Sequence, residues 1–415
     1  MVKYINYLKK FLSFAGPGYL VAVGYMDPGN WATGLAGGSR FGYTLLFVVL
    51  ASNFIALLLQ YCALKLGIVS GKDLARACRD YYSPATAKVL WVLAEVAVIA
   101  TDLAEVIGSA IGLQLLFGIP LLWGIALTVC DVLLLLFFTQ TRARSVQVLI
   151  TVLIAVIMSC FSIIVYLVKP IWSQVTIGFL PSVNIFKDFD LLYLAIGILG
   201  ATVMPHNLYL HSALVTPRPH NQRKKAIFYS SLDLGIALTF AFFVNAAIII
   251  VAAALFYKNG LYHVEEIQQA YYLFTPLLHT DIASFVFAIA LLISGQNSTV
   301  TGTLTGQIII EGFMNFSMPA WLRRLIGRLI TIIPAFISVY IFGECCVSSL
   351  MILSQVILSL QLPFAIFPLL EFTCNRNIMG EFANGRILKA CAYASACIIV
   401  TMNLLLILFL VKNFF

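Results

Sequence analysis

The sequence predicts an all-α integral membrane protein, and three observations lead to that fold class. Hydrophobic residues make up 61% of the 415 residues and charged residues only 10%, which leaves too little polar surface for a soluble domain. The apolar residues form long stretches along the whole chain, each near the length of about 20 residues that a helix needs to cross the hydrocarbon core. A transmembrane β-barrel would instead show short segments of alternating polarity. We therefore expect a single domain of membrane-spanning helices over residues 1–415.

Eleven stretches are predicted as transmembrane helices. The loops between them reach about 20 residues at most, which is too short for a further soluble domain. In chain order, the predicted spans are 13–36, 43–67, 86–117, 120–138, 146–168, 190–214, 227–257, 281–312, 322–342, 345–371 and 387–411.

The distribution of Lys and Arg predicts how the chain is oriented in the membrane. Short loops that carry these residues stay on the cytoplasmic side. With the amino terminus in the cytoplasm, 20 of the 25 basic residues fall on that side, and only Arg40, Lys169, Lys187, Lys258 and Lys412 fall outside it. The odd number of spans then places the carboxy terminus outside. The short chain favours a bacterial inner membrane for this multi-pass protein.

Several functional classes are disfavoured by the composition and by the absence of their motifs. The net charge of +8 follows from the topology, and no basic stretch is interleaved with aromatic residues as in a nucleic-acid interface. The nine cysteines are scattered without C-x-x-C spacing, as is typical of small buried side chains. We expect no enzyme, because the sequence lacks metalloprotease histidine spacing, G-x-S-x-G and a phosphate-binding loop.

Two similar motifs interrupt the first and the sixth predicted spans. The segments are D-P-G-N at 27–30 and M-P-H-N at 204–207, and both read x-Pro-x-Asn. Proline removes a backbone donor and clashes with the preceding turn, so each helix is expected to break there. Such irregular backbone survives at membrane depth where it is buried in protein or lines a cavity. Breaks in spans one and six predict two inverted repeats of five helices, with the substrate held between the breaks.

These breaks place the repeats at about 13–168 and 190–371, with an extra helix at about 387–411. The donors at the breaks predict the class of ligand. Asp27 offers an anionic oxygen, Asn30 a neutral oxygen and Met204 a thioether sulfur, and the unwound backbone offers carbonyls near Gly24 and Ala201. Oxygen donors alone suit magnesium or calcium, whereas a thioether adds preference for first-row transition ions. The mixture favours manganese, ferrous iron and their neighbours.

A carrier that concentrates a dication needs a driving ion, and the third predicted span carries three carboxylates. Glu95 and Asp102 lie on nearly the same line along a helix and Glu105 about 80° away, at about 100° per residue. One interpretation is a pathway for protons. The alternative is that one or two of these acids simply pair with Arg323 or Arg324 near the start of the ninth span.

His206 and the eighth span supply further polar side chains. The imidazole of His206, next to the second break, titrates near physiological pH. It either carries protons or only shapes the broken turn, and the sequence does not separate the two. The polar and glycine residues between 294 and 307 are expected mainly to serve close helix packing.

Five segments together resemble the Nramp family of proton-coupled divalent metal transporters, of the bacterial manganese transport type. Their order covers essentially the whole chain, and the set is far more specific than any one segment. The segments are D-P-G-N, M-P-H-N, ATDLAEVIGSAIGLQLL at 100–116, SGQNSTVTGTLTGQIIIEGF at 294–313 and LSQVILSLQLPFA at 353–365.

The resemblance implies a leucine-transporter-like fold in which Asp27, Asn30, Met204 and the carbonyl of Ala201 hold the metal. It also implies that Gln355 approaches the metal in some conformations, and that protons pass along the region of the three carboxylates. Manganese or ferrous iron would be imported by alternating access, as cargo and not as a cofactor. The expected partners are metal ions, protons and the lipid bilayer, with a monomeric assembly and no nucleic acid.

Two carriers of the same architecture remain as alternatives. A magnesium carrier would make Met204 irrelevant to selectivity. An amino-acid or organic solute symporter must hold a carboxylate on exposed backbone amides, and Asp27 would repel that anion unless an amine accompanied it.

Overall fold

A computed structural model describes residues 16–130, 143–215 and 217–414 of the chain. Every regular element in this part is helical, as the composition predicts. The α-helices are α2 (Pro17–Gly24), α3 (Pro28–Phe41), α4 (Leu46–Ser70), α5 (Leu74–Tyr81), α6 (Pro84–Phe117), α7 (Leu121–Leu127), α9 (Ala143–Val168), α10 (Trp172–Gly178), α11 (Phe189–Val203), α12 (Pro205–Leu214), α13 (His220–Leu255), α14 (Ile267–Leu278), α15 (Ile282–Met314), α16 (Ala320–Phe342), α17 (Val347–Cys374), α18 (Arg376–Met379) and α19 (Arg386–Phe414).

Eight helical segments of the described chain are long and apolar enough to cross a membrane. One of them, Pro28–Ser70, contains two helices, α3 and α4, separated by the 3₁₀ turn Gly42–Leu45. The long helix α6 is not among the eight, and its three carboxylates lower its hydropathy. The predicted span 120–138 is described only as far as residue 130, and its remainder lies outside the described residues. The count of eleven spans stays a prediction, as do the boundaries of the two repeats.

Both predicted helix breaks are present. The first separates α2 from α3 at residues 25–27, and the second separates α11 from α12 at Met204. Pro28 and Pro205 each occupy the first position of the second half-helix, where the missing N–H of proline is no loss. Met204 has a positive φ of 43°, a conformation that side chains other than glycine rarely adopt. The sixth span is therefore interrupted sharply.

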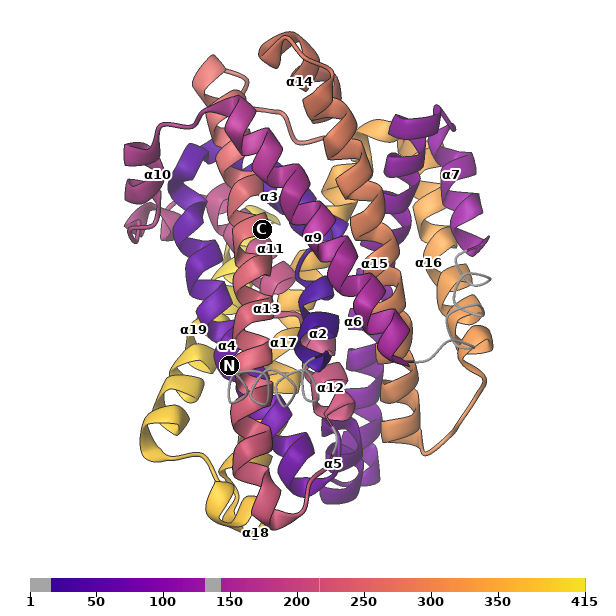
Figure 1. Cartoon of the computed structure of the whole chain (residues 1–415), viewed down its shortest axis with the longest axis vertical. Coiled ribbons are helices and arrows are strands. Elements are labelled where there is room, and N and C mark those ends of the chain that lie inside the picture. The colour runs from indigo at the N-terminus through magenta and orange to yellow at the C-terminus, as the bar shows by residue number, and fades with distance from the viewer. Residues whose placement is uncertain (1–15, 131–142, 216, 415) are drawn as a thin grey trace, which may run out of the picture.

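Packing of the long helices brings the two breaks together inside the bundle. The half-helix α3 packs on α11, α13 and α17, and α11 packs along α17. The half-helices α2 and α12 contact each other, and α6 runs along α15. Figure 1 shows the short α2 and α12 near the middle of the bundle, with longer helices around them. The breaks therefore lie in the interior, where lipid does not reach them.

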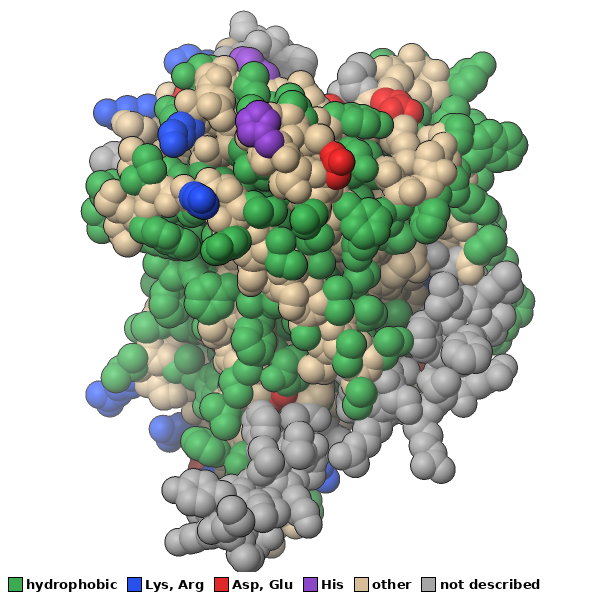
Figure 2. Space-filling view, turned by 45° about the horizontal axis from the view of Figure 1, so that its top comes forward, with side chains coloured by type: hydrophobic (Ala, Val, Ile, Leu, Met, Phe, Trp, Pro, Cys, Tyr) green, Lys and Arg blue, Asp and Glu red, His purple; other side chains and the backbone are tan. Residues whose placement is uncertain are grey.

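The flanks of the molecule are hydrophobic. Large apolar side chains are exposed on several helices, for example Phe54, Tyr166, Phe243 and Ile333. Figure 2 shows hydrophobic side chains over most of the visible flank, while charged side chains are gathered toward its ends. Such a surface needs a hydrocarbon solvent, in agreement with the membrane fold.

The ends of the bundle test the predicted distribution of basic residues. Helices α5 and α18 lie at one end, and α10 and α14 at the other (Figure 1). Three of the residues that we had counted on the cytoplasmic side, Arg323, Arg324 and Arg328, are buried within α16, at 9%, 3% and 0% exposure. A count of Lys and Arg cannot separate a loop charge from a buried partner of a carboxylate, so these three say nothing about orientation.

Candidate metal site

The first break places a carboxylate at the start of α3. Asp27 is the residue before this helix, and its Oδ1 accepts hydrogen bonds from the backbone N–H of Asn30 at 3.0 Å and from Asn30 Nδ2 at 2.6 Å. A side-chain oxygen is the usual partner for the free N–H groups of a helix start. Asp27 is completely buried, and its other oxygen, Oδ2, has no hydrogen-bond partner. One carboxylate oxygen is therefore left available in the interior.

The second break frees a backbone carbonyl opposite this carboxylate. In a continuous helix the carbonyl of Ala201 would accept from residue 205, but Pro205 has no N–H to donate. Instead Ala201 O accepts a hydrogen bond from Asn30 Nδ2 at 3.0 Å. This bond joins the two breaks directly, across 171 positions of sequence.

Met204 lies between the half-helices α11 and α12, at the turn itself. Its side chain is completely buried, and its sulfur accepts a hydrogen bond of 3.4 Å from Asn207 Nδ2. The carbonyl of Gly24 at the first break accepts from the backbone N–H of Asp27 at 3.2 Å. The sequence predicted two backbone carbonyls as metal ligands. Gly24 O is hydrogen-bonded within its own turn, whereas Ala201 O faces the other break.

Gln355 on α17 approaches Asp27 from a third direction. Its Nε2 donates to Ser354 Oγ at 2.9 Å, while its Oε1 is buried without a partner. Gly29 makes the approach possible, because a Cβ at that position would overlap the amide of Gln355 and would lie 3.1 Å from Asp27 Oδ2. The carboxylate and the amide therefore share the space beside Gly29.

The donor set fits a small divalent ion of intermediate hardness. Asp27 Oδ2 and Gln355 Oε1 are free oxygens, Ala201 O is a backbone carbonyl and Met204 Sδ is a thioether. Nowhere in residues 16–130, 143–215 and 217–414 do three or more His, Cys, Asp or Glu side chains form a group able to hold a metal ion, so a site built from such ligands is absent from these ranges. A single carboxylate with neutral oxygens and one sulfur suits first-row transition ions.

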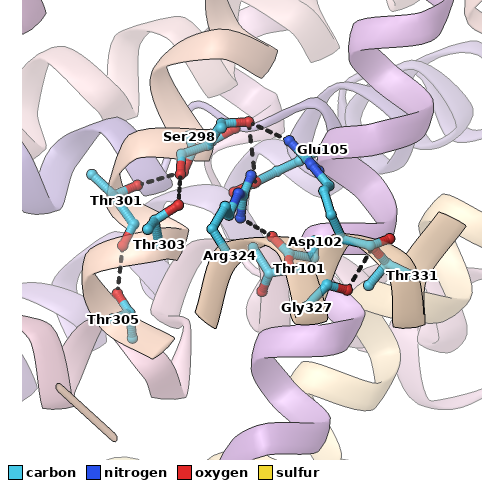
Figure 3. A network of polar contacts seen from close by, with 12 residues as sticks. Thr101, Asp102, Glu105, Ser298, Thr301, Thr303, Thr305, Arg324, Gly327 and Thr331 are labelled. Carbon is cyan, nitrogen blue, oxygen red and sulfur yellow. Dashed lines mark hydrogen bonds and ion pairs between the residues drawn. The ribbon is translucent and has the colours of Figure 1, made fainter. Parts of the chain in front are cut away.

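A second polar cluster lies beside this site, between α6 and α16. Arg324 donates to Asp102 Oδ1 at 2.6 Å and to Glu105 Oε2 at 3.3 Å, and the three side chains are almost completely buried. Arg323 pairs with Glu95 nearer the start of α6. Figure 3 shows Arg324 reaching from α16 toward Asp102 and Glu105. The pairing that the sequence left as an alternative is therefore present for all three carboxylates, and a proton pathway along them stays a prediction.

The cluster contains residues that the sequence analysis did not assign to it. Arg328 is completely buried and donates to Thr299 Oγ1 at 2.8 Å, and Thr299 in turn donates to Glu105 Oε2 at 3.4 Å. Thr299 belongs to α15, which we had assigned mainly to packing, so that assignment was too narrow. The sequence spacing could have indicated the place of Arg328, because it follows Arg324 by four residues and so lies on the same helix face.

His206 is linked to the carboxylate helix by a hydroxyl. Its Nδ1 lies 3.2 Å from Thr101 Oγ1, and the imidazole is 3% exposed. Thr101 Oγ1 also donates to the carbonyl of Ala97 at 3.0 Å. Because the hydroxyl has a single hydrogen, His206 Nδ1 accepts from it only if that hydrogen is shared with the Ala97 carbonyl. His206 therefore lies between the second break and α6. Its partner on α6, Thr101, directly precedes Asp102.

A family model described as "Natural resistance-associated macrophage protein-like" (Nramp) matches residues 18–409. The chain belongs to the Nramp family. A relative from Nostoc sp. named "Divalent metal cation transporter MntH" is 53% identical over 407 residues, covering 97% of this chain and 92% of that protein. A protein of the same name from Listeria welshimeri is 49% identical over 415 residues, with 99% of this chain and 93% of that protein covered.

Solved structures place the Nramp chain in a wider fold group. The Eremococcus coleocola manganese transporter is 40% identical, with a TM-score of 0.88 over 96% of this chain and 86% of that one. Mhp1 and MhsT are only 15% and 14% identical, yet they match with TM-scores of 0.60 and 0.63. At that identity they show the fold alone, and the leucine-transporter-like fold expected from the sequence is confirmed.

Proposed function

We propose that this Nramp protein imports divalent transition metal ions, manganese and ferrous iron, by proton-coupled alternating access across a cell membrane. The observation that carries the proposal is the buried, unpartnered oxygen of Asp27 where the two helix breaks meet. An unpaired carboxylate oxygen is costly inside a protein, so it persists where a cation arrives. Relatives named as divalent metal cation transporters, and a manganese transporter of the same fold, support this assignment.

Metal binding in this proposal begins with a rearrangement of Asn30. Its amide nitrogen now donates hydrogen bonds to both Asp27 Oδ1 and Ala201 O. A cation that enters between these oxygens must displace the N–H groups, so the amide turns and presents its oxygen instead. Asp27, Asn30 and Ala201 then supply oxygens from two breaks, Met204 supplies sulfur, and Gln355 closes the shell from α17.

The burial of the donors supports alternating access. Asp27, Met204 and Gln355 are all 0% exposed, so the site is closed to both sides in this conformation. The irregular residues between the half-helices are the natural hinges. Movement of α2 and α12 opens one side, and movement of α3 and α11 opens the other. The end with α5 and α18 is the cytoplasmic one in this proposal, with the amino terminus on the same side.

Protons are carried by the buried network of α6. Glu105 lies within electrostatic range of Asp27, and His206 within that of Asp102. A cation that binds a protonated Asp27 displaces the proton, which passes to Glu105 and on through Asp102 and Glu95 toward the cytoplasm. Arg323 and Arg324 keep these carboxylates in place and stabilise their charged forms.

Replacing Met204 by Ala tests the choice of metal. We expect the preference for manganese over calcium and magnesium to fall by about tenfold, the lower end of the usual 10- to 100-fold effect of a change around a bound metal. Uptake of the three ions into proteoliposomes measures it. Met379→Ala, which truncates a buried methionine of α18, is the matched control. Unaltered selectivity in Met204→Ala would favour a magnesium carrier built on oxygen donors alone.

A further inference from the structure

The first half-helix, α2, is held at its start by a carboxylate from a distant helix. Asp233 on α13 accepts hydrogen bonds from the backbone N–H of Gly18 at 2.7 Å and of Gly16 at 3.2 and 3.3 Å to its two oxygens. These residues are separated by 217 and 215 positions. Asp233 is 1% exposed, so the contact is sealed from solvent.

This arrangement differs from the starts of those helices that are capped by a neighbouring side chain. α3, α5, α6 and α11 are each capped by the residue that precedes them, Asp27, Asp73, Ser83 and Asp188. The segment Gly16–Pro17–Gly18 has no such side chain. The N–H groups at the start of α2 therefore depend on α13, and any separation of the two helices leaves them without this acceptor.

Gly18 is required for the close approach. A Cβ there would lie 2.7 Å from Asp233 Oδ2 and 2.8 Å from the backbone nitrogen of Leu234, which is closer than such atoms can stand. Within the described residues, no Lys or Arg forms an ion pair with Asp233. The positive end of the α2 dipole and its N–H groups stabilise the buried charge.

The position of α2 matters because the helix is only eight residues long and ends at the first break. Opening of the site on the α2 side requires α2 to leave α13. We propose that Asp233 is a positioning residue of the transport cycle, which holds α2 against α13 and keeps the cytoplasmic path to the metal site closed. The direction of opening rests on the proposed function, whereas the contact itself does not.

Hydrogen–deuterium exchange of the full-length protein in detergent tests the contact without any metal. In Asp233→Asn, one oxygen and the negative charge are lost, and we expect exchange of the backbone amides of residues 16–26 to rise by about tenfold, as for a lost charge-assisted hydrogen bond. Exchange in the half of α13 that ends at Leu255 stays unchanged. Asp188→Asn, which makes the same substitution and loses the same charge at the cap of α11, is the control and leaves residues 16–26 as they were.

Manganese uptake by the same variants tests the role in transport. Loss of the contact favours the state open to the cytoplasm, so KM for external manganese rises several-fold while maximal uptake changes less. Unaltered exchange at residues 16–26 in Asp233→Asn would overturn the proposal, and so would an equal rise throughout α13. Where Asp233→Asn does not fold, Gly18→Ala moves the same two groups apart and is read in the same way. A protein that carries no metal at all would overturn the proposed function, yet the exchange result would stand separately.

Discussion

Asp27→Asn is expected to reduce manganese uptake by about 100-fold or more, because loss of a group that only supports a ligand already costs about 10- to 100-fold in affinity. The substitution keeps the shape of the side chain and an oxygen that can cap α3. It removes the only negative charge among the proposed ligands. The remaining neutral donors then face a dication without compensation. Uptake into proteoliposomes and calorimetric titration with manganese measure the loss in transport and in binding.

Asp188→Asn provides the matched comparison for Asp27. Asp188 caps α11, the first half of the other broken helix, by accepting from the N–H groups of Asp190 and Leu191. It is an aspartate in the same local role without access to the metal. Its replacement should leave manganese binding within about twofold of the parent, as for an exposed cap whose effect is on stability alone. Equal losses in the two variants would mean that Asp27 serves only the helix start.

Asp102→Asn is expected to lower metal-driven proton influx by about 100-fold, the lower end of what one positioned proton-transfer group supplies. Asp102 has the shortest contact with Arg324 and lies between Glu105 and Glu95 on α6. Without its carboxylate the path is interrupted in the middle. A pH dye inside proteoliposomes follows the influx, and calorimetry shows that manganese binding at Asp27 is retained.

Asp80→Asn controls for the loss of a paired carboxylate as such. Asp80 lies on α5, outside the buried network, and pairs with Lys72 at 2.8 Å. Lys72 and Arg79 lower the pKa of this acid, so it is charged at neutral pH and loses the same charge in the variant. Proton influx should be normal. Full influx in Asp102→Asn would show that the ion pairs of α6 and α16 are structural and that protons take another path.

The broken helices could be predicted because their signals are local. A proline and a polar side chain inside an apolar stretch indicate a break wherever the stretch is too hydrophobic for a loop. The repeated x-Pro-x-Asn pattern further predicted that the substrate is held between the two breaks, and the bond of 3.0 Å between Asn30 and Ala201 joins them. Gln355 entered only through the family resemblance, since a lone glutamine on α17 carries no such local signal.

Other parts of the molecule depend on contacts that no local pattern encodes. The hydrogen bonds between Asp233 and α2 join segments more than 200 residues apart. Neither segment carries a motif from which its partner could be predicted. Thr299 lies in a run of small polar residues that equally suits helix packing. The buried arginines of α16 were counted with the charges on the cytoplasmic side, because a positive residue near the start of a predicted span has the same sequence pattern whether it meets water or a carboxylate.

Manganese uptake by the parent protein, recorded together with luminal pH, tests the central claim most directly. Proteoliposomes with an inward proton gradient and an internal pH dye receive manganese, calcium or magnesium outside. The proposed mechanism predicts saturable manganese uptake that is accompanied by acidification, with little uptake of calcium or magnesium. Manganese uptake without any change in the dye would contradict proton coupling, and a silent dye with no uptake of any of the three ions would contradict the metal site itself.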